Sequence, residues 1–131
     1  MEVEVAGAPA GGQPVFGGDV HVVWEKFCRC FDVEPRIVPL AEDKCTIGPE
    51  DVERHLDEST IGVVAVVGTT YTGHKDDVVG IDKLLREVRK ERDLDIPIHV
   101  DGASGGFVWP TRRKATSGRC RRTRSRPTRS G

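Results

Sequence analysis

The sequence predicts an α/β protein built on a mainly parallel sheet. Residues 61–67 are a nearly continuous β-branched run, residues 76–92 carry apolar side chains at helical spacing, and residues 96–100 are a second short apolar run. A β-branched run without alternation is typical of a strand covered on both faces, as in parallel sheets. A strand, a helix and a strand in this order predict a right-handed βαβ unit.

The first half of the chain predicts three more elements. Residues 1–17 are rich in Gly, Ala and Pro and have no periodicity, so we expect an irregular N-terminal segment. Apolar residues at helical spacing predict a helix over 20–31, and a short strand is expected over 35–40. A second helix is predicted over 49–56, since proline is well tolerated in the first helical turn.

The two strands of the βαβ unit end in glycine-rich loops, which are residues 68–73 and 101–106. Ligands of open α/β sheets bind outside the carboxyl ends of the strands, so both loops should border one site. Asp101 is expected to end a buried strand, beside glycines that let the backbone approach a ligand. This arrangement suits a site that needs one fixed negative charge.

Length and composition exclude several classes. The 131 residues leave room for one core, and 37% hydrophobic with 31% charged residues is typical of a soluble globular protein. The longest apolar run, residues 61–68, is far shorter than the roughly 18 residues of a membrane span. An acidic N-terminus does not resemble a secretory signal, so we expect a cytoplasmic protein without membrane contact. The four cysteines lack metal-ligand spacing, and no metal site is predicted.

Two motif-based alternatives are not favoured. Residues 102–106 match the G-x-S-x-G elbow of serine hydrolases, but no Asp, Glu or His follows Asp101, so Ser104 has no base in the chain order of that fold. A dinucleotide site is also not predicted, because no G-x-G-x-x-G follows a strand.

Three segments resemble one enzyme family. His99-Val-Asp-Gly-Ala-Ser-Gly-Gly-Phe107 is similar to the His-Val-Asp-Ala-Ala-Ser-Gly-Gly-Phe segment of pyridoxal-phosphate-dependent glutamate decarboxylases, which are group II decarboxylases. Trp24-Glu-Lys-Phe27 and the Thr-Tyr-Thr-Gly part of residues 68–73 resemble two further segments of that family. The resemblance covers about residues 18–110. It implies part of the large domain of a fold-type-I pyridoxal-phosphate-dependent transferase.

The resemblance implies cofactor-binding roles for four residues. Asp101 would pair with the protonated pyridine nitrogen, and Ala103 would pack on one face of the ring. His21 would lie over the other face, and Thr70 would donate a hydrogen bond near the ring oxygen or the substrate carboxylate. Structural alternatives are that Asp101 only caps the following turn and that His21 is a solvated surface residue.

The family's catalytic lysine, which forms the Schiff base with the cofactor, is expected to be absent from this chain. Gly73-His74-Lys75 imitates the Ser-Gly-His-Lys sequence around that lysine, but it precedes Asp101, whereas the family's lysine follows the Asp-containing strand. Lys75 is therefore interpreted as a solvated loop residue.

The parent reaction implied by the resemblance converts L-glutamate into 4-aminobutyrate and CO₂ in a homo-oligomeric enzyme. The chain by itself is expected to be inactive. Decarboxylation of a related amino acid is the alternative within the same family.

The C-terminal segment, residues 111–131, differs in composition from the rest. It carries a net charge of +9 without an acidic residue, whereas residues 1–110 carry −10. An Arg-rich disordered tail of this kind could bind nucleic acid through phosphates, which would make the protein a non-catalytic basic binding module. It has no aromatic residue for base stacking, and we favour a frameshift or a mispredicted gene end over nucleic-acid binding.

Overall fold

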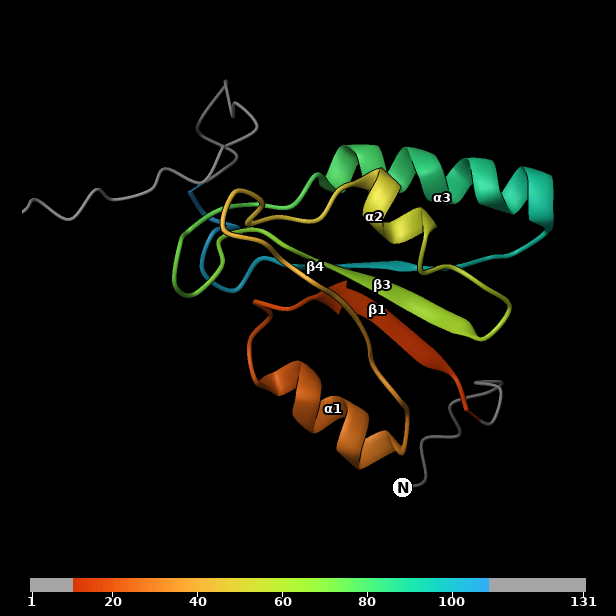
Figure 1. The fold of residues 1–131 in the computed structure, drawn as a ribbon, viewed down its shortest axis with the longest axis horizontal. Helices are drawn as coiled ribbons and strands as arrows, with labels where there is room; N and C mark the ends of the chain where they lie inside the picture. The colour runs from red at the N-terminus through yellow and green to blue at the C-terminus, as the bar shows by residue number, and fades with distance from the viewer. Residues whose placement is uncertain (1–10, 109–131) are drawn as a thin grey trace, which may run out of the picture.

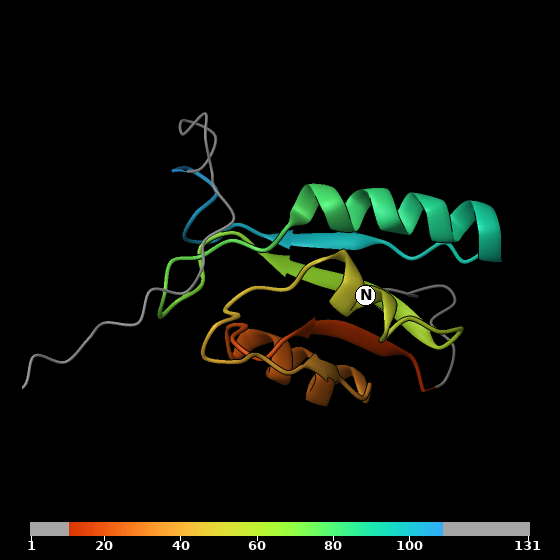
Figure 2. The same cartoon turned by 45° about the horizontal axis from the view of Figure 1, so that its top comes forward.

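The structure, a computed structural model, describes residues 11–108 and has three layers. A four-stranded, all-parallel sheet with strand order β2-β1-β3-β4 lies between α1 on one face and α2 and α3 on the other, as Figures 1 and 2 show. The elements are β1 (Gln13–Gly17), α1 (Val23–Phe31), β2 (Arg36–Val38), α2 (Pro49–Glu53), β3 (Thr60–Val66), α3 (Val78–Arg92) and β4 (Ile98–Asp101).

The predicted βαβ unit is confirmed. Strands β3 and β4 are adjacent and parallel, with Val63 opposite Ile98 and Val66 opposite Asp101, and α3 connects them. The carboxyl ends of both strands therefore meet at one edge of the sheet. Thr70, in the loop after β3, and Asp101 lie at this edge, as the parallel arrangement requires.

The expectation of an irregular segment up to residue 17 is wrong for its last five residues. Strand β1 lies inside the sheet between β2 and β3, and Val15 and Phe16 are almost fully buried. Its sequence signal is weak because only these two residues are strongly apolar and Pro14 lacks a backbone donor. The sheet accommodates Pro14 at a register irregularity between Gln13 and Pro14, where one ladder hydrogen bond can be omitted.

The remaining elements are present but shorter than predicted. Strand β2 covers only Arg36–Val38, since prolines stand directly before and after it. Helix α1 begins at Val23 instead of residue 20, and α2 ends at Glu53 instead of residue 56. Helix α3 begins at Val78 instead of residue 76, and β4 begins at Ile98 instead of residue 96.

The start of α3 is set by two neighbouring aspartates. Asp76 is buried and bonds to the backbone of other segments, while the Asp77 side chain caps the helix by accepting the Gly80 N–H at 3.0 Å. At the other end, Asp93 adopts the left-handed conformation that more often belongs to glycine at a helix C-terminus.

The hydrophobic core has two parts, one on each face of the sheet. The larger part lies between the sheet and helices α2 and α3, and its most buried members include Val15, Ile47, Val52, Val63, Ala65 and Ile81. The smaller part lies under α1 and joins Phe16 and Val64 to Cys28, with Trp24 and Phe27 packed beside them. Helix α1 is thus held to the sheet by aromatic packing next to the carboxyl ends of the strands.

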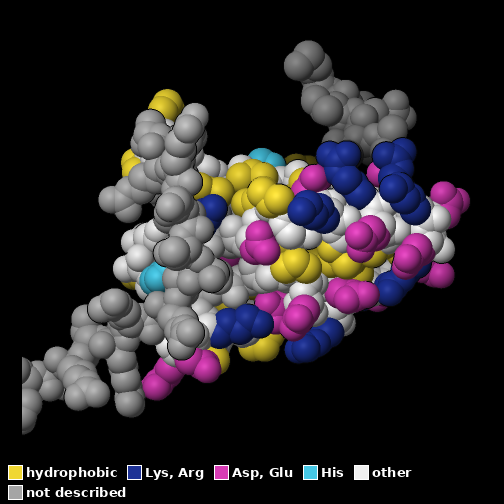
Figure 3. All heavy atoms as spheres, turned by 90° about the horizontal axis from the view of Figure 1, so that it is seen from above, with side chains coloured by type: hydrophobic (Ala, Val, Ile, Leu, Met, Phe, Trp, Pro, Cys, Tyr) yellow, Lys and Arg dark blue, Asp and Glu magenta, His cyan; other side chains and the backbone are white. Residues whose placement is uncertain are grey.

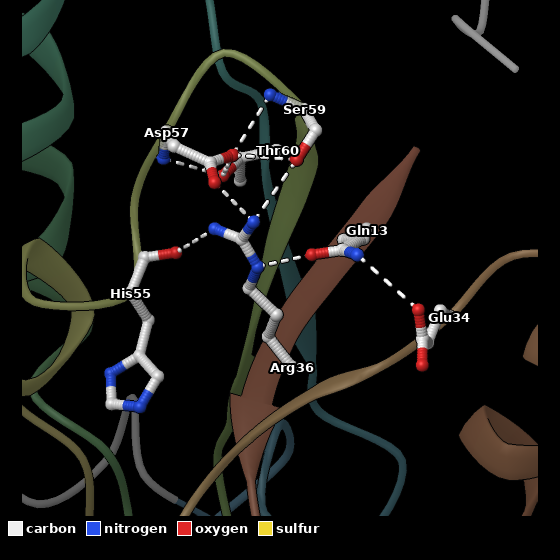
Figure 4. Close-up of polar contacts among 7 residues, drawn as sticks. All are labelled: Gln13, Glu34, Arg36, His55, Asp57, Ser59 and Thr60. Carbon is white, nitrogen blue, oxygen red and sulfur yellow. Dashed lines mark hydrogen bonds and ion pairs between the residues drawn. The ribbon is translucent and has the colours of Figure 1, made fainter. Parts of the chain in front are cut away.

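A cluster around Arg36 joins three segments at the amino-terminal edge of the sheet, opposite the glycine-rich loops (Figure 4). The guanidinium donates to the Gln13 side chain of β1 and forms an ion pair with Asp57 of the loop before β3. It also donates to the His55 carbonyl at 2.7 Å and to Ser59 Oγ at 3.0 Å. The nearby guanidinium lowers the pKa of Asp57, so this cluster weakens as Asp57 is protonated in acid.

The surface over α3 is strongly charged. Figure 3 shows acidic and basic side chains interspersed on this face, with apolar patches between them. Arg86 pairs with Asp82 one helical turn earlier, as exposed helix pairs commonly do. Among the helices within residues 11–108, none is long and apolar enough to cross a membrane.

The open edge of β4 predicts self-association. Within the described residues no strand pairs with its outer side, and Val100 of this edge strand is 43% exposed. We expect Val100→Lys to shift a concentration series in analytical ultracentrifugation toward monomer, because an edge lysine opposes strand pairing. Val79→Lys is the matched control, since Val79 is 65% exposed but lies on α3. A wild-type chain that stays monomeric and unfolds cooperatively would contradict this expectation.

Candidate functional site at the carboxyl edge of the sheet

Hydrogen bonds tie the loops after β3 and β4 to each other. The Val67 N–H donates to the Asp101 carbonyl at 2.8 Å, and the Gly105 N–H donates back to the Val67 carbonyl at 2.9 Å. The Ser104 hydroxyl donates to the Gly68 carbonyl at 2.8 Å. The two loops therefore form one unit at the edge of the sheet.

The contact between Gly68 and Gly105 admits no side chain. A Cβ on Gly68 would lie 2.8 Å from the Gly105 nitrogen and 2.9 Å from its Cα, and Gly68 has a φ of +91°. Both the conformation and the space at Gly68 thus require glycine. This explains physically why a glycine begins the loop.

The carboxylate of Asp101 is held by two donors from different segments. The Ala103 N–H donates to Oδ1 at 3.2 Å, which is the turn-capping interaction considered above. The indole Nε1 of Trp24, on α1, donates to Oδ2 at 2.9 Å. A carboxylate has about four lone-pair positions, so these two donors leave acceptor capacity for a further partner.

The other three predicted residues lie around this carboxylate or on the same edge. Ala103 is exposed two residues after Asp101. His21 is exposed just before α1, and its Nδ1 accepts the Val23 N–H at 3.2 Å, so the proton of the neutral ring is on Nε2. The His21 backbone carbonyl accepts the backbone N–H of Trp24 at 3.0 Å. This bond connects His21 to the residue whose indole contacts Asp101.

Thr70 projects from a compact loop. The His74 carbonyl accepts the N–H groups of Gly68 and Thr69, at 3.0 and 2.9 Å, and the Gly73 N–H donates to the Thr69 carbonyl at 2.9 Å. Thr69 is buried, whereas Thr70 is exposed on the loop. The loop therefore fixes the backbone of Thr70 while leaving its side chain accessible to a ligand.

Asp76 is a buried carboxylate that sequence reasoning did not single out. Its oxygens accept the Ile47 N–H at 2.9 Å and the Val66 N–H at 2.7 Å, so it joins the end of β3 to the segment before α2. Burial raises the pKa of Asp76 to about 6, although the two hydrogen bonds act to lower it. The nearby negative charge of Asp19 adds to the rise. The sequence signal for Asp76 was an acidic residue directly before the N-cap residue of a helix. In sequence this pattern cannot be distinguished from an ordinary acidic residue in the first turn of a helix.

Ser104 of the hydrolase-like motif and Lys75 of the Gly-His-Lys motif both take part in contacts of the two loops. Ser104 Oγ uses its proton in the hydrogen bond to Gly68. Lys75 is exposed in the loop before α3, where it forms an isolated bridge with Val67. It precedes the βαβ helix, as the sequence predicted.

Together, the parallel sheet and the site at its carboxyl edge define an α/β protein of the class that binds ligands beside the strand ends. The sequence matches the family described as the pyridoxal-dependent decarboxylase conserved domain over residues 10–125, a longer stretch than the 18–110 indicated by the motifs. The chain belongs to this family.

Individual relatives agree with this assignment. The chain is 45% identical over 96 residues to a glutamate decarboxylase of Lactococcus lactis subsp. cremoris, covering 73% of the chain and 21% of that protein. It is 47% identical to a glutamate decarboxylase of Petunia hybrida, with 73% and 19% covered. A solved glutamate decarboxylase of Lactobacillus brevis is similar with a TM-score of 0.68 and 37% identity, covering 75% of the chain and 22% of that structure. The chain thus spans about a fifth of the length of these relatives.

Replacing the glycine at the loop contact should destabilise the protein. We expect Gly68→Ala to cost more than Gly73→Ala in chemical unfolding, because both glycines have positive φ but a Cβ on Gly73 meets nothing within 4 Å. Gly73→Ala should cost about 1 kcal/mol for the left-handed conformation alone, and Gly68→Ala ~1–3 kcal/mol more for the overlap with Gly105. Equal costs would show that the loop contact is not tight.

Asp76 predicts a specific pH dependence of stability. Because its folded pKa is above the unfolded value of 3.8, its protonated form stabilises the fold below that value, and this contribution is lost as pH rises through about 6. The wild type should lose on the order of 3 kcal/mol relative to Asp76→Asn between pH 4 and 7. Urea unfolding of both chains across this range measures the difference, and parallel curves would contradict it.

Proposed function

We propose that this chain is the cofactor-binding part of a cytoplasmic glutamate decarboxylase, which uses pyridoxal 5′-phosphate to convert L-glutamate into 4-aminobutyrate and CO₂ with uptake of a proton. The similarity to glutamate decarboxylases from bacteria and a plant supports this substrate. The family assignment supports the cofactor.

The observation that carries the proposal is the Asp101 carboxylate at the end of β4. It is partly buried, it is oriented by two N–H donors, and it keeps acceptor capacity for a third. A pyridine nitrogen that carries a proton needs such an acceptor. The donor and acceptor set at this edge of the sheet therefore fits the proposed cofactor.

The neighbouring residues fit the faces and the rim of a flat ring. Ala103 has a side chain small enough to lie against a ring face, and the imidazole of His21 could stack on the opposite face. The exposed hydroxyl of Thr70 can donate to an oxygen of the cofactor or to the substrate carboxylate. These roles remain proposals for the chain.

The chemistry divides between cofactor and protein. When bound, pyridoxal phosphate is an electron sink for the carbanion left by departing CO₂. Asp101 would hold the ring-nitrogen proton and so maintain the positive charge of the ring. Ala103 and His21 would fix the plane of the ring, and Thr70 would orient the carboxylate or oxygen that it contacts.

The domain boundaries are part of the same proposal. Residues 18–110 would belong to the large cofactor-binding domain of a homo-oligomeric parent enzyme. The N-terminal segment 1–17 overlaps β1 in its last residues, as described above. The basic segment 111–131 lies outside the described residues, so nucleic-acid binding by it, and its proposed origin in a frameshift, stay predictions.

A chimera tests the proposed reaction. Residues 13–108 would replace the equivalent segment of the Lactobacillus brevis glutamate decarboxylase, whose structure superposes on this fold. We expect the chimera to release CO₂ from carboxyl-labelled glutamate, and Asp101→Ala to reduce the rate ~10²-fold or more. The 131-residue chain alone should release none.

The matched control is Asp82→Ala, which removes an exposed carboxylate that pairs with Arg86 on α3 and should leave the rate unchanged. A chimera that retains its cofactor but does not decarboxylate glutamate would contradict the proposed substrate. In the chain alone, stoichiometric borohydride trapping of the cofactor at Lys75 that disappears in Asp101→Ala would show that Lys75 is a cofactor site.

A further inference from the structure

Trp24 forms a hydrogen bond that connects α1 to the proposed cofactor site. Its indole N–H donates to Asp101 Oδ2 at 2.9 Å, across 77 positions of sequence. Within residues 11–108, the other donor to this carboxylate is the backbone N–H of Ala103, so the Trp24 indole is the one side-chain donor among these residues. The turn after β4 alone would leave Oδ2 without this restraint.

The indole is itself held in place. Its ring meets the ring of His99 edge-on, with centroids 4.9 Å apart at 65°, and lies 5.9 Å from Phe27 at 63°. His99 is two residues before Asp101, so both side chains lie on the α1 face of β4. Trp24 therefore packs on His99 and bonds to Asp101 with the same ring.

The segment that leads into α1 carries another proposed cofactor contact, His21. His21 precedes Trp24 by three residues, and the backbone N–H of Trp24 donates to the His21 backbone carbonyl at 3.0 Å. One short segment thus sets both the imidazole and the indole at this edge. An indole N–H can only donate, so its oxygen partner must act as an acceptor.

We propose that Trp24 is a positioning residue, which fixes the orientation of the Asp101 carboxylate toward the pyridine nitrogen of the cofactor. This inference rests on the proposed function, since it assumes that Asp101 receives that nitrogen. Trp24 acts through Asp101 and makes no contact of its own with the reacting atoms.

The first measurement tests the hydrogen bond directly. The chain has two tryptophans, so Trp109→Phe leaves the Trp24 indole as one assignable N–H resonance in a ¹H–¹⁵N spectrum. At a dilution where the chain is monomeric, this resonance should move upfield when Asp101→Ala is added. A resonance that does not move overturns the inference.

The second measurement uses pyridoxamine 5′-phosphate, which cannot form a Schiff base with surface lysines because it carries an amine in place of the aldehyde. Trp24→Phe keeps an aromatic ring and removes only the donor, and it should weaken binding about three- to tenfold, the effect of one hydrogen bond. In an Asp101→Ala background the same substitution should have no effect. Binding of the analogue with C–H in place of the ring nitrogen should not respond to either change.

The outcomes separate the two claims. If Asp101→Ala weakens binding but Trp24→Phe does not, or if both effects simply add, Trp24 has no positioning role while the proposed function stands. If Asp101→Ala leaves binding of pyridoxamine 5′-phosphate unchanged, the proposed function fails at this carboxylate and the inference fails with it. If Trp24→Phe weakens binding of the analogue with C–H in place of the ring nitrogen as much as it weakens binding of pyridoxamine 5′-phosphate, the effect comes from lost packing. That result would also overturn the inference.

Discussion

The close approach of Gly68 to Gly105 is the constraint on which the geometry of the site depends. Parallel pairing of β3 and β4 brings two chain segments to the same edge, but it does not fix how the loops beyond the strands pack. Backbone contact without side chains, together with the Ser104–Gly68 hydrogen bond, sets the distance between those loops. The edge that carries Asp101 and the loop that carries Thr70 thereby form one connected surface.

The site draws on three segments that are far apart in sequence. Strand β4 supplies Asp101, and the loop after β3 supplies Thr70. The third segment supplies Trp24 from the first turn of α1 and His21 from just before that helix. Buried Asp76 stabilises the base of the loop after β3, because its carboxylate connects the end of β3 to the segment before α2. Because burial raises the pKa of Asp76, the stability of this junction is expected to depend on pH.

Local patterns were sufficient to predict the βαβ unit and the meeting of its two glycine-rich loops at one edge of the sheet. The β-branched run of β3 and the helical stripe of α3 are strong signals, and a strand-ending aspartate followed by a glycine-rich loop points to a ligand. Strand β1 was not predictable in this way, since Pro14 and the flanking glycines are typical of a loop and only its position between two other strands makes it regular. Secondary structure there is imposed by tertiary pairing.

The contacts of Asp101 show the same limit. Its capping of the following turn could be predicted from a short sequence, because donor and acceptor are two residues apart. Its bond to Trp24 could not, because it depends on how α1 packs against Phe16 and Val64 of the sheet. Family motifs identified the Trp24 segment as significant but gave no physical role for the indole.

The proposed function depends on the Asp101 carboxylate receiving the ring nitrogen of a pyridoxal-type cofactor. A crystal structure of the chain with pyridoxamine 5′-phosphate tests it most directly. We expect the ring nitrogen at about 2.7–2.9 Å from an Asp101 carboxylate oxygen, with Ala103 and His21 on opposite faces of the ring. A ligand bound elsewhere on the chain, or a ring whose nitrogen points away from Asp101, would contradict the claim.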